Sequence, residues 1–388
     1  MTKNIEIQEL PLWDKLAEMR TPLSIEFELT ARCNLNCRHC YINLGANDNT
    51  ARSKELSLNE INTIADQAAG LNSIWCLLTG GEPLLRSDFM EIYLSLKKKG
   101  FLINVFTNAC LIKESHIHLF KQYPPRDIEV SVYGVTQATY ESITRVPGSY
   151  QAFRRGLDLL LSNDIDVTLK AMALRSNLHE IEAIADFCRE RTKHSYRFDP
   201  FLHLRYDRDS LRNEEIKQER LSPQNIVDLE KSDQSRFQSL QNHCEDLIFP
   251  EKLTYEDCIS SKEMEESEAC KAFKKLFRCG IGNGGFTISY DGHLRLCSTL
   301  LAPGTTFDLR SGTLKDGLET LRTKIRAMET KSIKILKTCK SCKIVNLCMW
   351  CPAIAYLETG NLEGEVPYFC QVAHARAEAL QASLNKSS

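Results

Sequence analysis

The sequence predicts an α/β protein, in which an open partial barrel of six strand–helix repeats precedes a helical bridge and a small cysteine-rich domain. Two observations carry this prediction. Apolar β-rich segments alternate with segments of helical periodicity in the first half, and the cysteines gather in two places. A chain of 388 residues has room for two or three domains. We expect the barrel in residues 1–207, the polar helical bridge in 208–268 and the cysteine-rich domain in 269–388.

Six short β-rich segments begin the strand–helix repeats. They are residues 23–29, 74–79, 102–107, 128–133, 167–172 and 196–204. Three of the helical segments between them begin at the good N-caps Ser57, Ser87 and Asn177. Six repeats are too few for a closed eight-stranded barrel, so we favour an open barrel, with a flat doubly wound sheet as the alternative. In both geometries the chemistry belongs at the carboxyl ends of the strands.

Charge and composition exclude several classes of protein. The 49 basic and 51 acidic side chains leave a formal net charge of −2, which rules out a broadly basic nucleic-acid-binding surface and gives no reason to invoke a membrane. No apolar run approaches the roughly 20 residues of a membrane helix, and the N-terminus does not resemble a signal peptide. We therefore expect a cytoplasmic protein, in which 16 clustered cysteines indicate metal ligands before disulfides.

The first cysteine group directly follows the first predicted strand. Cys33, Cys37 and Cys40 form a C-x3-C-x2-C pattern. Three thiolates can bind three irons of a [4Fe–4S] cluster and leave the fourth iron open to a ligand from outside the protein. A closed structural site would use four ligands, and His39 keeps a zinc site as the alternative.

A glycine-rich turn ends the second predicted strand. Here the sequence reads TGGEP, with Gly80, Gly81, Glu82 and Pro83. Two glycines at the carboxyl end of a strand let the backbone approach a ligand closely, and Glu82 offers an acceptor there.

The second cysteine group occupies the last third of the chain. Two C-x2-C pairs separated by five residues are strong metal-ligand spacing, for which zinc is a rival to iron–sulfur. The group consists of Cys270, Cys279, Cys297, Cys339, Cys342, Cys348, Cys351 and Cys370.

The C-x3-C-x2-C pattern after the first strand and the GGEP turn after the second strand resemble the two main motifs of the radical SAM superfamily. The resemblance implies that S-adenosylmethionine binds the open iron, that residues 80–83 lie against its methionine amine, and that one-electron reduction yields a 5′-deoxyadenosyl radical that abstracts a substrate hydrogen. It also implies a low-potential electron donor. Further cofactor contacts are expected from His39, Asn108, Ser131, Lys170 and Arg205.

The cysteine-rich region resembles the SPASM extension of the same superfamily, which carries two auxiliary [4Fe–4S] clusters in addition to the first. The resemblance assigns Cys279, Cys297 and Cys351 to one auxiliary cluster, with Cys270 as the candidate fourth ligand. It assigns Cys339, Cys342, Cys348 and Cys370 to the other. The chain departs from the pattern once, because two residues rather than three separate Cys348 from Cys351.

The resemblance implies an enzyme that modifies a ribosomally made precursor peptide by cross-linking, scission, epimerisation or oxidation. About 20 residues precede the first strand, too few for the peptide-recognition domain of many such enzymes. We therefore expect a separate leader-recognition protein, or the barrel itself, to bind the leader.

Two other functions remain open. A sulfatase-maturing oxidase would place an aspartate after Cys297, where this chain has Ser298. A non-enzymatic iron–sulfur or zinc redox module would need neither an open iron nor the GGEP motif.

Overall fold

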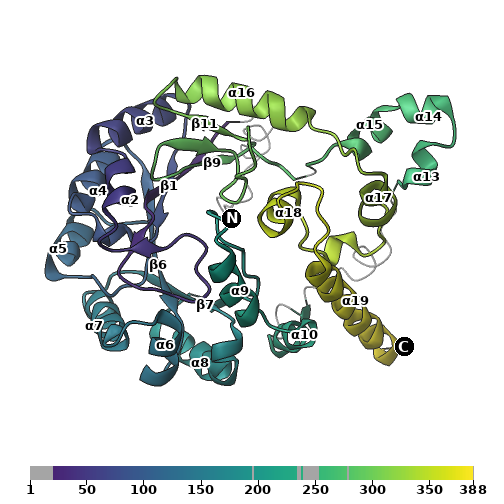
Figure 1. Ribbon diagram of the computed structural model, residues 1–388. Helices are drawn as coiled ribbons and strands as arrows, with labels where there is room; N and C mark the ends of the chain where they lie inside the picture. The colour runs from purple at the N-terminus through teal and green to yellow at the C-terminus, as the bar shows by residue number, and fades with distance from the viewer. Residues whose placement is uncertain (1–20, 195, 234–236, 239–252, 278, 388) are drawn as a thin grey trace, which may run out of the picture. The chain divides into compact units, whose positions relative to one another are not determined.

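The computed structural model describes residues 21–194, 196–233, 237–238, 253–277 and 279–387 (Figure 1). Its contacts divide the chain into two compact units. The barrel unit comprises Met1–Phe201, Arg205–Glu219 and Gly280–Arg322. The cysteine unit comprises Leu202–Leu204, Arg220–Cys279 and Thr323–Ser388. Each unit is described by itself.

The barrel unit contains a nine-stranded sheet whose first six strands in sequence run parallel. These are β1 (Ser24–Thr30), β4 (Trp75–Gly80), β5 (Leu102–Thr107), β6 (Asp127–Val132), β7 (Val167–Met172) and β8 (Arg197–Asp199). Each new strand is added on the same side of the last, whereas a doubly wound sheet reverses its strand order. The predicted open barrel is therefore confirmed and the flat alternative is wrong.

Helices cover the outer face of this curved sheet (Figure 1). They are α2 (Asn49–Lys54), α3 (Leu58–Gly70), α4 (Phe89–Lys98), α5 (Glu114–Gln122), α6 (Gln137–Thr144), α7 (Ser149–Leu161) and α8 (Ile181–Arg191), and α9 (Ser210–Glu219) follows β8. Ser57 caps α3 as the sequence predicts, in a reciprocal capping box with Glu60. Ser87 does not cap α4, whose N-cap is Asp88. Asn177 lies within a 3₁₀ turn that precedes α8.

Three further strands extend the barrel sheet beyond β1. β9 (Gly285–Ile288) pairs parallel to β1, and β10 (His293–Arg295) and β11 (Thr306–Asp308) follow it in antiparallel pairing. The structure therefore differs from the predicted division at residue 269, because the segment 280–322 packs with the barrel. Sequence alone could not show this, since β9 reaches β1 only through a pairing across more than 250 residues.

The two faces of β1 have opposite characters. Ile25 and Phe27 are buried on one face, while Glu26 and Glu28 alternate with them on the other. Arg295 from β10 is fully buried and forms an ion pair with Glu28. Burial raises the pKa of Glu28, and Arg295 acts against that rise. The inner face of the sheet is thus ionic, unlike a barrel filled by apolar side chains.

The cysteine unit is built from short helices and turns. It contains α10 (Pro223–Ser232), α13 (Tyr255–Cys258), α14 (Lys262–Glu266), α15 (Glu268–Lys274), α17 (Ile333–Ile335), the π-helix η4 (Leu336–Lys340), the 3₁₀ turn η5 (Val345–Leu347), α18 (Pro352–Thr359) and α19 (Pro367–Ser387). A further helix, α16 (Leu314–Ala327), leads from the barrel unit into it. α10 packs along α19, where Glu230 and Arg376 form a buried ion pair. None of the described helices is long and apolar enough to cross a membrane.

The buried Glu28–Arg295 pair generates a testable prediction. The substitution R295M leaves a carboxylate in the barrel wall without its cation, which should lower the free energy of unfolding by about 3–5 kcal/mol. The double variant E28Q/R295M removes the unpaired charge and should recover part of that loss. Urea denaturation followed by circular dichroism measures both. Equal destabilisation of the single and double variants would contradict a stabilising role for the pair.

Candidate cofactor-binding site

The three cysteines of the first group lie on a loop that leaves the carboxyl end of β1. The loop is closed at its base by a small parallel pair, β2 (Arg32–Cys33) and β3 (Leu44–Gly45). The amide of Leu35 donates to the Cys33 Sγ at 3.3 Å, and the amide of Asn43 donates to the Cys40 Sγ at 3.3 Å. Hydrogen bonds of this kind to cysteine sulfurs are a means of tuning iron–sulfur sites.

The cysteine sulfurs are withdrawn from solvent. Cys33 and Cys37 are buried and Cys40 is half-buried. Burial raises the pKa of all three thiols, and the neighbouring Cys40 raises that of Cys37 further. Three thiolates without a cation would be unfavourable here, so the residues fit a positively charged iron core. In the described part of the chain no three His, Cys, Asp or Glu side chains converge as ligands of one ion, and a cubane does not require that, because each thiolate takes a different iron.

The GGEP turn packs directly against the start of the cysteine loop. The amide of Gly81 donates to the Thr30 carbonyl at 2.6 Å, and that of Glu82 donates to the Arg32 carbonyl at 2.9 Å. A Cβ on Gly81 would lie 2.3 Å from the Arg32 carbonyl oxygen. In the structure the absence of a Cβ on Gly81 lets the backbone of the cysteine loop approach closely, and the expected contact of these glycines with a ligand stays a prediction.

Glu82 is fully buried and joins the ends of two strands. Its carboxylate accepts hydrogen bonds from the Thr107 hydroxyl at 2.8 Å, the Asn108 amide at 2.8 Å and the Leu84 amide at 3.1 Å. Burial raises the pKa of Glu82 to about 7, against the effect of these donors. The contact also orients Asn108, whose side-chain amide donates to the Asn34 Oδ1 at 2.9 Å. Pro83 begins the following 3₁₀ turn.

The remaining predicted cofactor contacts fall into two places. His39 is buried in the loop with its ring centroid 5.0 Å from that of Tyr133, and burial, followed by the charge of Arg212, lowers its pKa to about 4. Ser131 and Lys170 are register neighbours on β6 and β7. The ammonium of Lys170 lies 3.1 Å from the Glu129 carboxylate and 3.8 Å from the centroid of the Phe106 ring.

Arg205 packs against the cysteine loop, and its expected contact with the cofactor stays a prediction. Its guanidinium is buried, pairs with Asp207 and donates to the carbonyls of Cys40 and Asn43 at 3.4 and 3.3 Å. Arg212 of α9 makes matching contacts, and sequence reasoning missed it because α9 gives only a polar helical pattern.

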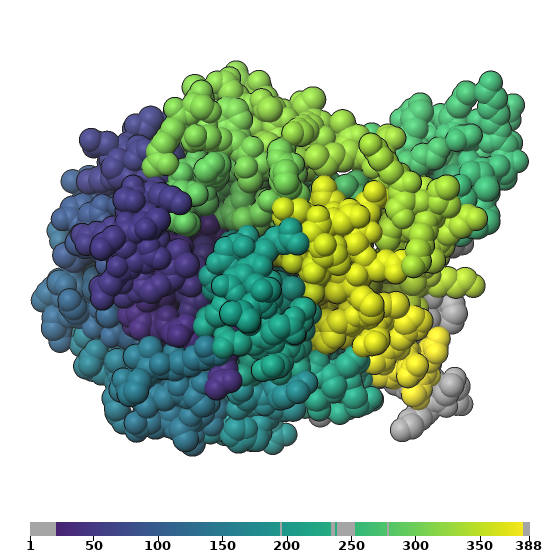
Figure 2. All heavy atoms as spheres, in the orientation of Figure 1, coloured from purple at the N-terminus to yellow at the C-terminus, as the bar shows by residue number. Residues whose placement is uncertain are grey.

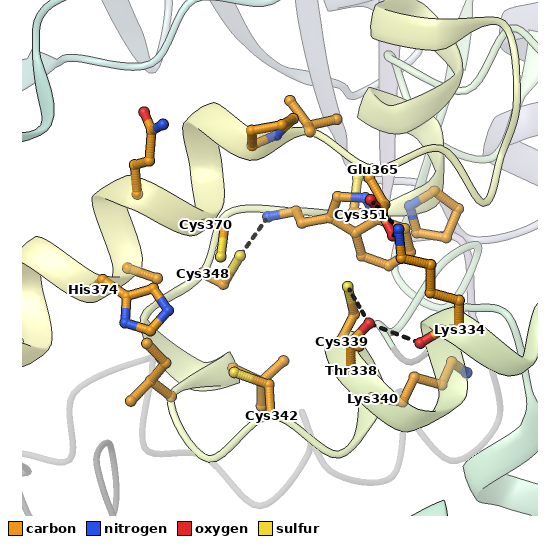
Figure 3. Close-up of a pocket in the computed structure, with 18 of the residues that line it drawn as sticks. Lys334, Thr338, Cys339, Lys340, Cys342, Cys348, Cys351, Glu365, Cys370 and His374 are labelled. Carbon is orange, nitrogen blue, oxygen red and sulfur yellow. Dashed lines mark hydrogen bonds and ion pairs between the residues drawn. The ribbon is translucent and has the colours of Figure 1, made fainter.

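A cavity of about 1000 Å³ in the cysteine unit is lined by most cysteines of the second group. Its lining includes Cys279, Cys339, Cys342, Cys348, Cys351 and Cys370 (Figure 3). The pKa of the Cys348 thiol is raised by burial and then by Cys370, Cys339 and Cys342, so these four thiols lie within electrostatic reach of one another. They are the four residues that the sequence assigns to one auxiliary cluster.

The other predicted ligand set is not gathered in this way. Cys279 and Cys351 belong to the cysteine unit and Cys297 to the barrel unit, so the set draws on both.

Cys270 departs from its prediction, because the structure pairs it with Cys258 in a disulfide with a Cα–Cα distance of 5.5 Å. The close packing of α13 and α15 brings the two together in a buried apolar cluster. A disulfide sulfur carries no thiolate for iron, which corrects the assignment of Cys270 as a ligand. Cys244, left unassigned by the sequence, lies outside the described residues.

The contact between Gly81 and the cysteine loop generates a second prediction. G81A should lower the free energy of unfolding by about 2 kcal/mol and loosen iron retention, because the added Cβ forces the loop backbone away. G45A is the matched control, since a Cβ there meets no atom within 4 Å. Iron content after anaerobic reconstitution and a urea melt measure the two effects. Equal behaviour of G81A and G45A would contradict the close-packing role.

Known proteins support this reading of the fold. Residues 27–188 match the Radical SAM superfamily. The AdoMet-dependent heme synthase of Methanosarcina barkeri is 24% identical over 359 residues, which cover 91% of this chain and 97% of that protein. The antilisterial bacteriocin subtilosin biosynthesis protein AlbA of Bacillus subtilis is 28% identical over 174 residues, 45% of this chain and 38% of its own length.

Solved structures cover nearly the whole chain. Streptococcus suis SuiB bound to S-adenosylmethionine matches 92% of this chain and 80% of its own with a TM-score of 0.63 and 18% identity. The same protein bound to its precursor peptide SuiA gives a TM-score of 0.61 and 17% identity over 94% of this chain and 80% of its own. At such identities the likeness establishes the fold and not the substrate. Residues 27–188 therefore form a radical SAM domain, and the fold of the chain is similar to that of SuiB.

Proposed function

We propose that this radical SAM enzyme modifies a ribosomally made peptide, using one cluster that binds S-adenosylmethionine and two auxiliary [4Fe–4S] clusters. The observation that carries the proposal is the cavity of the cysteine unit, which is lined by all four predicted ligands of one auxiliary cluster, Cys339, Cys342, Cys348 and Cys370. The similarity of fold to a protein solved with its precursor peptide supports the choice of substrate class.

In this proposal Cys33, Cys37 and Cys40 hold the first cluster, whose chemistry is reductive cleavage of S-adenosylmethionine to a 5′-deoxyadenosyl radical. The protein's own contribution is placement and exclusion of water. Glu82 fixes the edge of the site through Thr107 and Asn108. The turn at 80–83 would contact the methionine moiety of S-adenosylmethionine. The buried, neutral ring of His39 would contact its adenine.

The inner wall of the barrel would face the substrate. Lys170, held by Glu129 and stacked over Phe106, presents a fixed positive charge in a half-buried setting. Glu26 lies on the same wall, and burial, with a smaller effect of Glu28, raises its pKa to about 7. Such a wall suits a polar substrate, as a peptide backbone with charged side chains is.

The auxiliary clusters would be ligated unequally. Cys339, Cys342, Cys348 and Cys370 supply four thiolates, which is a complete set for one cubane. Cys279, Cys297 and Cys351 supply three, and the disulfide at Cys270 leaves the fourth position without its predicted ligand. An open iron at that cluster could then bind substrate directly.

A second candidate function has a specific observation in its favour. The relative that aligns over 97% of its own length is named AdoMet-dependent heme synthase, so an iron-porphyrin substrate is the alternative. We favour a sulfatase-maturing oxidase less, because Ser298 stands where an aspartate is expected. A non-enzymatic redox module does not explain the buried Glu82 turn beside an open three-cysteine site.

Mass spectrometry after anaerobic incubation with reductant and S-adenosylmethionine tests the proposal. The substrates are a peptide encoded beside the gene and, in parallel, iron-coproporphyrin. Loss of two hydrogens from the peptide indicates cross-linking or dehydrogenation, a lost residue-sized fragment indicates scission, and deuterium uptake from heavy water indicates epimerisation. Conversion of the porphyrin with an unchanged peptide would overturn the proposal in favour of the alternative.

The first cluster's ligands give a third prediction. Replacing Cys33, Cys37 and Cys40 together by Ala should abolish 5′-deoxyadenosine formation and lower the iron content by about one cubane per chain, because these three thiolates are the proposed ligands of that cluster. Chromatographic detection of 5′-deoxyadenosine with reductant present is the measurement. The double variant C76A/C188A is the control, since these two cysteines are buried within β4 and α8. Persistent cleavage in the first variant would refute the ligand assignment.

The cavity of the cysteine unit gives a fourth prediction. C339A/C342A should lower the iron content by about four atoms per chain and leave uncoupled 5′-deoxyadenosine formation in place, because the first cluster has its own ligands. Zinc in place of iron in the purified wild-type protein, measured by elemental analysis, would show that the cavity is not an iron–sulfur site.

A further inference from the structure

Two arginines from the segment after β8 reach back to the cysteine loop of the barrel unit. Arg212 of α9 donates from Nη2 to the Cys37 carbonyl at 3.0 Å and from Nη1 to the Asn36 Oδ1 at 3.0 Å. Arg205 donates from Nη1 to the Asn43 Oδ1 at 3.0 Å and to the Cys40 carbonyl at 3.4 Å. Each guanidinium therefore holds the carbonyl of a predicted cluster ligand.

Asn43 joins the two contacts. Its Oδ1 accepts from Arg205 and also from the Arg212 Nη2 at 3.3 Å. Its backbone amide donates to the Cys40 Sγ, and its side-chain amide donates to the Leu35 carbonyl at 3.4 Å. The loop between Asn36 and Asn43 thus gains its shape from groups nearly 170 residues away. Figure 2 shows this teal segment lying directly beside the purple segment that carries the loop.

Carboxylates surround the two arginines on the side away from their contacts with the loop carbonyls. Arg205 is paired with Asp207. Arg212 shares Glu215 with Arg145, at 3.3 and 2.7 Å, so one carboxylate faces two guanidinium groups. Asp209 also lies beside them, because its Oδ1 accepts from the Arg212 backbone amide at 3.0 Å. The charge of Arg212 on the cysteine loop is therefore the one that its guanidinium carries to the Cys37 carbonyl.

A cubane bound by three thiolates is an anion, and its reduced state carries one more negative charge. A nearby positive charge stabilises the reduced state more than the oxidised one, and so makes the reduction potential less negative. Hydrogen bonds to ligand carbonyls also set the loop geometry that receives the cluster.

We propose that Arg212 is a positioning residue for the S-adenosylmethionine-binding cluster, which fixes the Cys37 carbonyl and supplies the positive charge that favours the reduced cluster. The proposal rests on assignment of the first cluster to Cys33, Cys37 and Cys40. It is independent of whether the substrate is a peptide.

The test compares R212Q, R212K and K217Q in the reconstituted full-length protein. Lys217 is the matched control, because it lies on the same helix, is exposed and pairs only with Glu214 among the ion pairs of the described residues. The midpoint potential is read from the part of the reduced-cluster EPR signal that changes on adding S-adenosylmethionine, which separates this cluster from the auxiliary ones. Release of iron to a chelator measures how well the loop holds the cluster.

We expect R212Q to shift the midpoint potential to a more negative value and to release iron about tenfold faster, the effect of losing a charged hydrogen bond. R212K keeps the charge and loses the forked contacts, so it should retain most of the potential and release iron faster. K217Q should match the wild type. A wild-type potential and release rate in R212Q would overturn the proposal, and so would an equal shift in K217Q. Equal shifts in R212Q and R212K would overturn its electrostatic part.

A second variant keeps the proposal testable if R212Q does not fold. E215Q removes the carboxylate that Arg212 and Arg145 share and leaves both guanidinium groups in place. The midpoint potential of the cluster should then move to a less negative value. A shift in the opposite direction, or none, would contradict the role of the charge on Arg212. Absence of any EPR signal that responds to S-adenosylmethionine in the wild type would instead contradict the cluster assignment, which distinguishes failure of the proposed function from failure of this inference.

Discussion

The candidate site depends on one close backbone contact, between the turn after β4 and the first residues of the cysteine loop. Gly81 and Glu82 donate amide hydrogens to the carbonyls of Thr30 and Arg32, at a separation that leaves no room for a Cβ on Gly81. This contact carries Glu82 into a buried position where it receives the Thr107 hydroxyl and the Asn108 amide. The ends of three neighbouring strands are thereby fixed to one another and to the loop that bears the cysteines.

The barrel unit buries several charged groups, and two of its buried carboxylates are paired with a cation. Glu28 is balanced by Arg295 and Glu129 by Lys170. The buried thiols of the cysteine loop have raised pKa values, and the compensation there would come from the iron itself. A radical SAM enzyme needs substrate and cofactor to meet at the carboxyl ends of the strands. The polar wall of the barrel and the cysteine loop after β1 suit that requirement.

The stability of the cysteine unit is expected to depend more on its cysteine thiolates than on the packing of its helices. Most of its helices are short, and an ion pair between Glu230 and Arg376 joins two of the longer ones. Metal binding to thiolates of the kind that line its cavity is itself a source of folding free energy. The disulfide between Cys258 and Cys270 adds a covalent link to the same unit. A substitution of a cysteine in the cavity should therefore also change the stability of this unit.

The sequence by itself determined the six strand–helix repeats and the two groups of cysteines, and it favoured the open barrel, because periodicity and ligand spacing are local properties. The set of Cys339, Cys342, Cys348 and Cys370 came from the resemblance to a family, and the structure brings these thiols near one another. Only the tertiary structure decided the rest. It moved residues 280–322 into the barrel sheet, paired Cys270 with Cys258 and brought Arg205 and Arg212 to the cysteine loop. Those contacts join residues far apart in the chain, and no local pattern specifies which distant partner a buried strand, thiol or guanidinium will meet.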